Sequence, residues 1–217
     1  MNLPCSEKTA KDLKKRKRLG LGVHLNVTLG GPLSRPSEIP SLLKPEKRFR
    51  RPPDYLEKMP LAKEIEKEYE AQIQSFLKHF GRKPDHFDTH HHLHDHPVFF
   101  AALREAALRW KVPVRRSRIF HLEKFSKRIK DLKTTDFIFG NLEARSHWQE
   151  DSFLGVVENL PEGTSEIGCH PGHCDASLRQ TSSMQDVREE ELTLFAQVKF
   201  RKLFRDIGIE LIRFSDL

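Results

Sequence analysis

The 217-residue sequence lacks several features that mark common classes of protein. It has no run of about 20 apolar residues, the length needed to cross a bilayer. Its N-terminal residues carry no apolar stretch behind their charges, so we expect neither a secretory signal nor a membrane span. The patterns GxGxxG, GxxxxGK[ST] and GxSxG are also missing, which excludes the usual nucleotide-binding and serine-hydrolase signatures. These absences predict a cytoplasmic protein.

Cysteine is scarce as well. The three cysteines, Cys5, Cys169 and Cys174, cannot all pair within one chain, and none is spaced as CxxC. This pattern is typical of reduced thiols in a reducing compartment. Cys169 and Cys174 flank a histidine-containing turn, so a zinc site at this turn is a weaker alternative to the interpretation developed below.

Positive charge is in excess, with 38 Lys and Arg residues against 31 Asp and Glu residues. Much of the excess lies in two segments, residues 11–18 and 44–51. Neither segment interleaves its charges with aromatic side chains, as many RNA-binding surfaces do. We therefore favour solvated basic segments over nucleic-acid binding, and expect no nucleic-acid partner.

The apolar pattern predicts an α/β protein. We expect a basic tail at residues 1–19 and one domain at 20–217, with a long loop at 30–58. Strands are predicted near residues 19–28, 86–90, 112–116, 137–140, 165–169 and 209–214. Helices are predicted at residues 61–80, 97–110, 151–160 and 186–207. Alternating strands and helices indicate a mainly parallel sheet, whose sites lie at the carboxyl ends of strands.

Histidines occupy three of these strand ends, at His24, His90 and His170. The second of them opens the segment 88–97, DTHHHLHDHP, which holds five histidines between positions 90 and 96. Imidazole is a common ligand of zinc, copper, iron and nickel. Only one or two of these side chains can face one ion, because neighbours on a strand point to opposite faces. Metal binding is the preferred interpretation, and a hydrogen-bonded core histidine is the alternative for His24 in particular.

The third strand end carries CHPGH, in which Pro171 and Gly172 force a turn directly after His170. A histidine fixed there is suited to act as a general acid near neutral pH. The alternative is that His170 caps the turn through its backbone. Glu166 falls on the same face of the strand, where it either orients His170 or forms a simple ion pair.

Taken together, these segments resemble the YdjC-like family, which includes chitooligosaccharide deacetylases and hopanoid-associated relatives. The resemblance runs in order through GVHLNVTLGGPLS (22–34), FGRKPDHFDTHHHLHDHP (80–97), VPVRRSR (112–118), SEIGCHPGHCD (165–175) and the RxxEL of residues 188–192. It covers residues 20–217, and the combined pattern is specific although no single piece is.

The resemblance implies a distorted β/α barrel that hydrolyses N-acetyl groups of short chitin-like glycans with a magnesium or zinc ion. It implies His24 and His90 as metal ligands, and His170 as the group that protonates the departing amine. Asp88, in support of a ligating histidine, and three further residues are expected to orient ligands or contact the substrate: His92, Arg115 and Glu166.

One departure from the family pattern stands out. Family members open with a strand carrying Asp-Asp-Phe-Gly, which supplies a metal-binding aspartate and a base, and this chain has no such motif. The family's first two β/α units are therefore expected to be missing, leaving an incomplete barrel with an open edge. Such an edge predicts lower stability or a homodimer. It also leaves a second hypothesis open, an inactive family member that binds sugar or metal without turnover.

Overall fold

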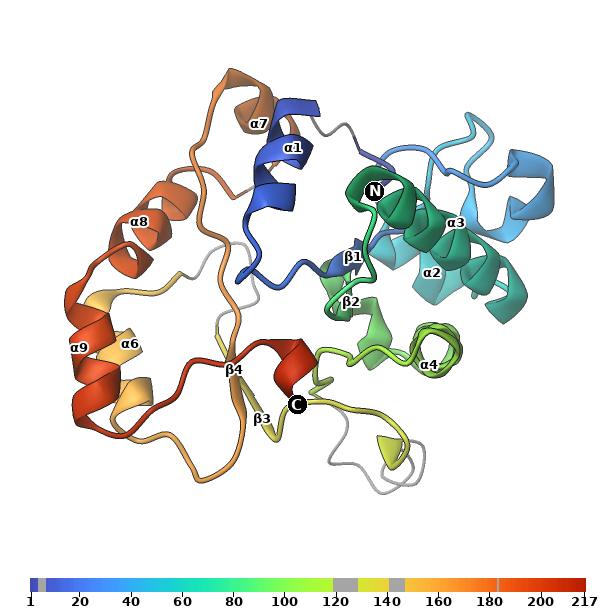
Figure 1. The fold of residues 1–217 in the computed structure, drawn as a ribbon. Helices are drawn as coiled ribbons and strands as arrows, with labels where there is room; N and C mark the ends of the chain where they lie inside the picture. Colours follow the sequence, from blue (N-terminus) through green and yellow to red (C-terminus); the bar gives the residue numbers. More distant parts are fainter. Residues whose placement is uncertain (4–6, 119–128, 141–146, 183) are drawn as a thin grey trace. The chain divides into compact units, whose positions relative to one another are not determined.

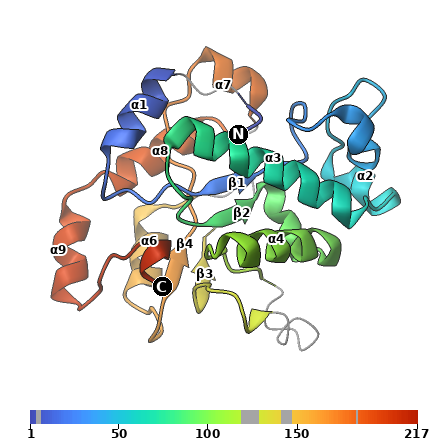
Figure 2. The same ribbon diagram turned by 45° about the vertical axis from the view of Figure 1, so that its right-hand side comes forward.

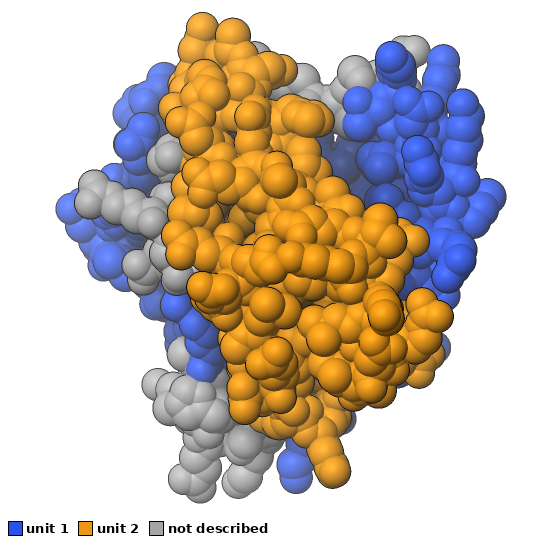
Figure 3. Space-filling model, turned by 90° about the vertical axis from the view of Figure 1, so that its left-hand side faces the viewer, with its two compact units in different colours: residues 1–134, 213–217 blue, residues 135–212 orange. Residues whose placement is uncertain are grey.

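The computed structural model describes residues 1–3, 7–118, 129–140, 147–182 and 184–217. The chain divides into two compact units, residues 1–134 with 213–217 and residues 135–212, which are coloured separately in Figure 3. Each unit contains a parallel pair of short strands and an apolar core of its own. The mixed α/β class with parallel strands is thereby confirmed, whereas the incomplete barrel and the single domain at 20–217 stay predictions. No helix in the described part of the chain is long and apolar enough to cross a membrane.

The first unit is built on β1 (Val23–Leu25) and β2 (Phe87–Thr89), which are labelled in Figure 1. The two strands run parallel, with His24 opposite Asp88. A single parallel bridge joins Phe87 to Val114, where we predicted a longer strand at 112–116. Val23 and Leu25 are each 1% exposed, whereas the side chain between them faces solvent. Alternation of this kind directs His24 away from the core, onto the same face of the pair as its neighbour Asp88.

Two helices cover this core, α3 (Ala62–Phe80) and α4 (Pro97–Trp110), and they pack against each other (Figure 2). Both agree with the predicted helices. Gly81 ends α3 in the left-handed conformation with φ 63°, and Pro97 occupies the first turn of α4. The apolar stripe of α3 is fully buried, and it consists of Ile65, Tyr69, Ile73 and Phe76.

Polar side chains of α3 are buried too, which the apolar spacing of the helix does not predict. Glu68 is 0% exposed and accepts the backbone N–H groups of Leu33 (3.1 Å) and Ser34 (2.9 Å). Glu64 accepts the backbone N–H and the hydroxyl of Ser41, each at 2.7 Å. Buried carboxylates need such partners, so they fasten the segment after β1 to the helix.

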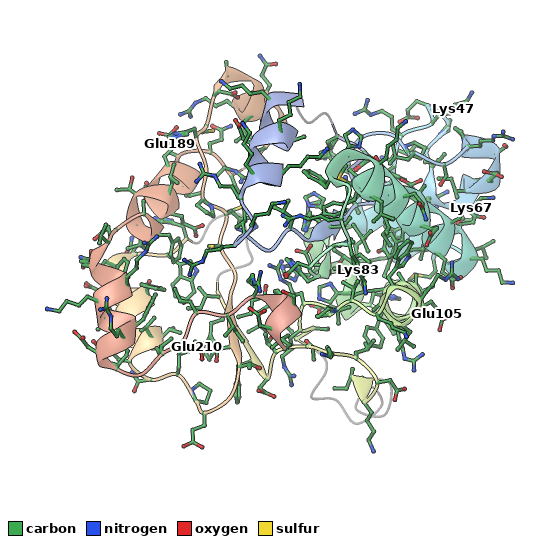
Figure 4. The ribbon with its side chains drawn as sticks, in the orientation of Figure 1. Lys47, Lys67, Lys83, Glu105, Glu189 and Glu210 are labelled. Carbon is green, nitrogen blue, oxygen red and sulfur yellow. The ribbon has the colours of Figure 1, made fainter. Side chains whose placement is uncertain are left out.

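The segment 30–58, predicted as a long loop, therefore contains regular structure. It contains the 3₁₀ turns η1 (Pro36–Glu38) and η2 (Pro40–Leu42) and the short helix α2 (Pro52–Glu57). Its apolar side chains Ile39, Leu42, Phe49 and Tyr55 enter the core. Lys67 of α3, labelled in Figure 4, pairs with Glu38 of η1 at 2.7 Å.

The two ends of the chain also differ from expectation. The basic tail expected at residues 1–19 contains the helix α1 (Glu7–Lys15), which packs on α3 and buries Ala10. The predicted strand at 209–214 is wrong: the chain there is irregular and ends in η4 (Phe214–Asp216). Its alternating apolar pattern is not enough, because a strand forms only with a partner in register, and Arg213 and Asp216 instead close a capped turn.

The second unit pairs β3 (Phe137–Phe139) with β4 (Ser165–Ile167) and adds α6 (Glu150–Val157) and α7 (Ala176–Thr181). The single helix predicted at 186–207 is two helices, α8 (Asp186–Phe195) and α9 (Lys199–Asp206). The ring of Phe153 explains the break, because its centroid lies 5.2 Å from that of Phe195 and 6.2 Å from that of Phe204. Nine residues along a straight helix turn by roughly 180°, so an unbroken helix would point these two rings in opposite directions.

Candidate active site

Strand register builds the candidate site of the first unit. His24 of β1 lies opposite Asp88 of β2. On the other side of β2, the backbone N–H of Arg115 donates to the carbonyl of Phe87. The three side chains therefore form a row across β1, β2 and the segment that follows the bridge at Val114. Asp88 thereby meets His24, which lies 64 positions earlier in the sequence, and Arg115, which lies 27 positions later.

Asp88 is the centre of this row. Its Oδ2 accepts Nδ1–H of His24 at 2.8 Å and Nη1–H of Arg115 at 2.7 Å, and its side chain is 8% exposed. Burial acts to raise the pKa of Asp88, but the hydrogen bond and charge of His24, with the charge of Arg115, lower it well below its usual value. Asp88 is thus an ionised acceptor that fixes which nitrogen of His24 carries the proton.

His24 directs its other nitrogen toward His90. Nε2 of His24 lies 3.1 Å from Nδ1 of His90, and the two rings are edge-on with their planes at 78°. Two nitrogens that share one zinc ion through bonds of about 2.0–2.1 Å are about 3 Å apart or slightly more. A carboxylate on the far nitrogen of a ligating histidine is the usual supporting arrangement. The pair therefore fits a divalent cation, and the same distance also fits a direct hydrogen bond between the imidazoles.

The backbone after His90 is strained. His91 (φ 57°) and His92 (φ 49°) both adopt the left-handed conformation, which costs a non-glycine residue on the order of 1 kcal/mol or more. A hydrogen bond of 2.9 Å joins Nδ1 of His91 to the hydroxyl of Thr28, and the ring of His91 lies 3.9 Å from that of His90. The sharp turn lets the chain leave β2 at His90 and keeps its imidazole beside His24.

The other histidines of the segment have separate surroundings. Burial, followed by the nearby His94 and Arg115, lowers the pKa of His92 to about 3, so this ring is neutral at physiological pH. His94 is fully buried, and its Nδ1 lies 2.6 Å from the hydroxyl of Thr89. His96 precedes α4 and contacts Phe99 edge-on. Of the five, only His90 is brought against His24.

A third protein ligand is not found in this arrangement. Across the described ranges, no group of three or more His, Cys, Asp or Glu side chains is placed to hold a metal ion. Asp95 accepts bonds from the hydroxyl of Ser117 (2.5 Å) and from Nε of Arg118 (3.0 Å). Asp88 is committed to His24 and Arg115. The same finding gives no support to a zinc site at Cys169 and Cys174.

His170 and Glu166 belong to the second unit. Glu166 lies in β4 opposite Ile138, and His170 follows the end of that strand by three residues. The half-buried His170 is held through its backbone N–H, which donates to Glu191 of α8 at 2.5 Å. That His170 faces the pair of His24 and His90, and that Glu166 orients it, stay predictions.

Sequence reasoning gave no role to two residues that the structure brings to these histidines. Thr28 stands in the recognised stretch GVHLNVT, but its contact with His91 spans 63 positions. Glu191 is the glutamate of RxxEL, and its contact with His170 spans 21 positions. In both cases the family pattern marked the position, and only the fold shows what it touches.

Comparison with known proteins gives consistent relatives. A carbohydrate deacetylase of Geobacillus stearothermophilus is 31% identical over 216 residues, which cover 99% of this chain and 83% of the relative. A carbohydrate deacetylase of Brevibacillus brevis is 32% identical over 210 residues, 94% of this chain and 80% of the relative. A solved structure from Enterococcus faecalis V583, described as a cellobiose-phosphate cleavage protein, superposes with a TM-score of 0.87 at 25% identity. That match covers 99% of this chain and 84% of the solved one.

The model of the YdjC-like protein family matches residues 1–206, nearly the whole chain. Together with relatives above 30% identity along almost all of its length, this match shows that the chain belongs to the YdjC-like family.

Proposed function

We propose that this chain is a carbohydrate deacetylase that hydrolyses the N-acetyl group of short chitin-like or related glycans. Membership of the YdjC-like family and relatives described as carbohydrate deacetylases support the reaction class. The observation that carries the proposal is the pair of imidazole nitrogens, 3.1 Å apart, on His24 and His90. Both lie on the solvent side of the strand pair, where a glycan has access, since the His24 side chain is 52% exposed.

His24 and His90 would hold a divalent cation, magnesium or zinc. Such an ion supplies Lewis acidity toward the amide carbonyl and lowers the pKa of water. Asp88 keeps Nδ1 of His24 protonated and Nε2 free to donate its lone pair, and Arg115 keeps Asp88 ionised. His92 is neutral, and the charge of the nearby Arg115 helps to keep its pKa low. It is therefore suited to contact the sugar rather than to carry a proton.

His170 is proposed as the general acid that donates a proton to the amine as the C–N bond breaks. Without this proton the amine is a poor leaving group, and imidazole can donate it near neutral pH. His170→Ala should then lower kcat by about 100-fold or more while leaving cation affinity unchanged.

Catalytic inactivity with retained binding is the second candidate function. It is favoured by one observation, that the described residues offer two imidazoles and no third metal-ligating side chain beside them. Under this alternative the chain binds cation or sugar without turnover.

Acetate release separates the two functions. The full chain is incubated with N-acetylglucosamine oligomers and added magnesium or zinc, and acetate is measured against His24→Ala and His90→Ala variants. Because the solved relative is described as a cellobiose-phosphate cleavage protein, a phosphorylated disaccharide that carries an N-acetyl group belongs in the same assay. Acetate release that both variants abolish supports the deacetylase. Sugar or cation binding without any acetate supports the inactive family member.

A further inference from the structure

In the second unit, the backbone that follows β4 packs closely against the backbone that follows β3. Gly168 donates its N–H to the carbonyl of Phe139 at 2.8 Å, which extends the strand pairing by one bond. Gly140, at φ 128°, lies so close that a Cβ there would meet the carbonyl oxygen of Gly168 at 2.5 Å. His170 comes two residues later, before the turn at Pro171. The strand pairing therefore fixes the backbone as far as Gly168, but it does not hold the peptide group of His170.

Glu191 of α8 holds one side of that peptide. Its side chain is 1% exposed, and its two oxygens accept different backbone N–H groups: Oε2 that of His170 at 2.5 Å and Oε1 that of Trp148 at 3.1 Å. A buried carboxylate with two N–H donors forms short, directional, charge-assisted bonds. The peptide of His170 is thus fixed relative to α8 and to the segment that carries Trp148.

Arg188 holds the other side. It precedes Glu191 by three residues, so both side chains lie on one face of α8. Nη1 of Arg188 donates to the carbonyl oxygen of His170 at 3.4 Å, and the carbonyl of Arg188 accepts the N–H of Gly172 at 3.0 Å. Its guanidinium is itself held by the carbonyl of Met184, at 3.0 Å from Nε. The backbone on both sides of the His170 side chain is therefore bonded to the same helix.

Neighbouring glutamates show that these contacts are particular to Glu191. Glu189, labelled on α8 in Figure 4, accepts the N–H of Cys174 at 2.8 Å. Glu190 pairs with His147, and its side chain is 58% exposed. Glu189 and Glu190 thus bond Cys174 and His147, whereas Glu191 bonds the backbone of both His170 and Trp148.

We propose that Arg188 and Glu191 are positioning residues that fix the backbone of His170, and through it the direction of the imidazole. The inference rests on the proposed function for the role of His170, and it assigns the RxxE pattern of residues 188–191 a purpose in that reaction. It predicts that loss of either side chain acts through His170 and not on binding of the sugar.

The test uses the full chain and the variants Glu191→Gln, Arg188→Met and Arg188→Lys, with Glu190→Gln as the matched control on the same helix. Glu191→Gln replaces one acceptor by an NH₂ group that cannot receive an N–H. We expect kcat for acetate release from N-acetylglucosamine oligomers to fall about 10- to 100-fold with KM nearly unchanged. Arg188→Lys should recover part of the loss seen with Arg188→Met, and Glu190→Gln should match the wild type.

A double-mutant cycle separates positioning from general destabilisation. In a His170→Ala background, Glu191→Gln should cost nothing further, because its effect passes through the missing imidazole. Equal losses with and without His170 would overturn the proposal. Thermal melting identifies variants that fail to fold, and Arg188→Met then takes the place of Glu191→Gln in the cycle.

A readout independent of activity distinguishes failure of this inference from failure of the proposed function. Amide hydrogen exchange at His170 and Trp148 should accelerate at least about 10-fold in Glu191→Gln, whereas exchange at His170 should stay unchanged in Glu190→Gln. If the wild-type chain releases no acetate, the proposed function fails, and exchange alone decides the positioning. Unchanged exchange at His170 in Glu191→Gln overturns the inference whatever the activity.

Discussion

At the scale of the residue, the state of the candidate site depends on how Asp88 is bonded. A carboxylate that accepts from both His24 and Arg115 is an acceptor only, so it selects the tautomer of His24 with its proton on Nδ1. The lone pair of Nε2 then points to His90. Changing Asp88 should therefore change cation binding without removing any proposed ligand.

Asp88→Asn is expected to lower zinc or magnesium affinity about 10- to 100-fold, because an amide can present N–H to His24 and no longer enforces the tautomer. Isothermal titration of the purified chain measures the affinity. Asp95→Asn is the matched control, since Asp95 bonds Ser117 and Arg118 instead. Equal affinities in Asp88→Asn and wild type would contradict the role given to Asp88.

His91 allows the backbone strain to be measured separately. Both His91→Gly and His91→Ala remove the hydrogen bond to Thr28, but only glycine adopts φ 57° without steric cost. We expect the glycine variant to unfold with a free energy about 1 kcal/mol higher than the alanine variant. Urea denaturation followed by circular dichroism gives both values. An alanine variant as stable as the glycine variant would mean that the turn relaxes when the imidazole is removed.

At the scale of the element, α3 is the support of the first unit. One face buries its apolar stripe, and the buried Glu64, Glu68 and Gln72 bond the backbone of the segment that follows β1. Gln72 exchanges two hydrogen bonds with the backbone of Asn26, at 2.6 and 3.0 Å. The helix thereby ties the strand of His24 to the segment that follows it.

Glu68→Gln is expected to lower the free energy of unfolding by about 1–3 kcal/mol, because the partly buried backbone N–H of Leu33 or of Ser34 loses its acceptor. Amide exchange at both residues should rise with it. Glu66→Gln, on the same helix and only partly buried, should change the stability by less than about 0.5 kcal/mol. If the two variants are equally stable, the segment is held by its apolar side chains instead.

Elements marked by local signals could be predicted from the sequence. The bounds of α3 and α4 follow from apolar spacing ended by Gly81 and opened by Pro97, because these residues act on the chain next to them. Elements that depend on distant partners could not. The segment at 209–214 has the apolar pattern of a strand but no strand to pair with. The break between α8 and α9 depends on contacts with Phe153, more than forty positions earlier.

The candidate site divides in the same way. His24 and His90 were found because their residue types and family motifs are visible in the sequence. Their separation, their orientation and the bonds of Asp88 follow from the register of β1 against β2, which sequence does not specify for three-residue strands. The buried glutamates of α3 and Glu191 of α8 look like solvent-facing charges until the backbone groups that they accept are known.

At the scale of the whole molecule, the chain returns to its first unit at the end. Oδ2 of Asp85 accepts the N–H of Ser215 at 3.1 Å, and the ring of His86 stacks on Phe214 with centroids 4.3 Å apart. Lys133 bonds the carbonyl of Leu217 at 2.7 Å. Gly22 makes room for this contact, because a Cβ there would meet the ring of His86 at 2.4 Å.

This attachment should depend on pH through Asp85. Burial acts to raise the pKa of Asp85, but its bonds with His86 and Ser215 lower it below the usual value. A lowered pKa in the folded state contributes stability that is present above the unfolded pKa, about 4, and is lost as pH falls through the folded value. Asp85→Asn should thus cost about 1–2 kcal/mol at pH 7, and this difference should shrink below about pH 4.

Urea unfolding of wild type and Asp85→Asn between pH 3 and pH 7 measures this difference. Asp131→Asn is the control, since the side chain of Asp131 is 65% exposed and pairs with Arg104 at 3.1 Å. A difference that stays constant across the range would show that Asp85 is not the group that titrates.

The central claim is that His24 and His90 bind one cation together, and X-ray absorption at the zinc edge tests it most directly. For the full chain loaded with one equivalent of zinc, we predict two imidazole nitrogens at about 2.0–2.1 Å and no sulfur in the first shell. One imidazole should disappear in His24→Ala and one in His90→Ala. Sulfur scattering, or a spectrum that neither substitution changes, would place the ion elsewhere and contradict the account.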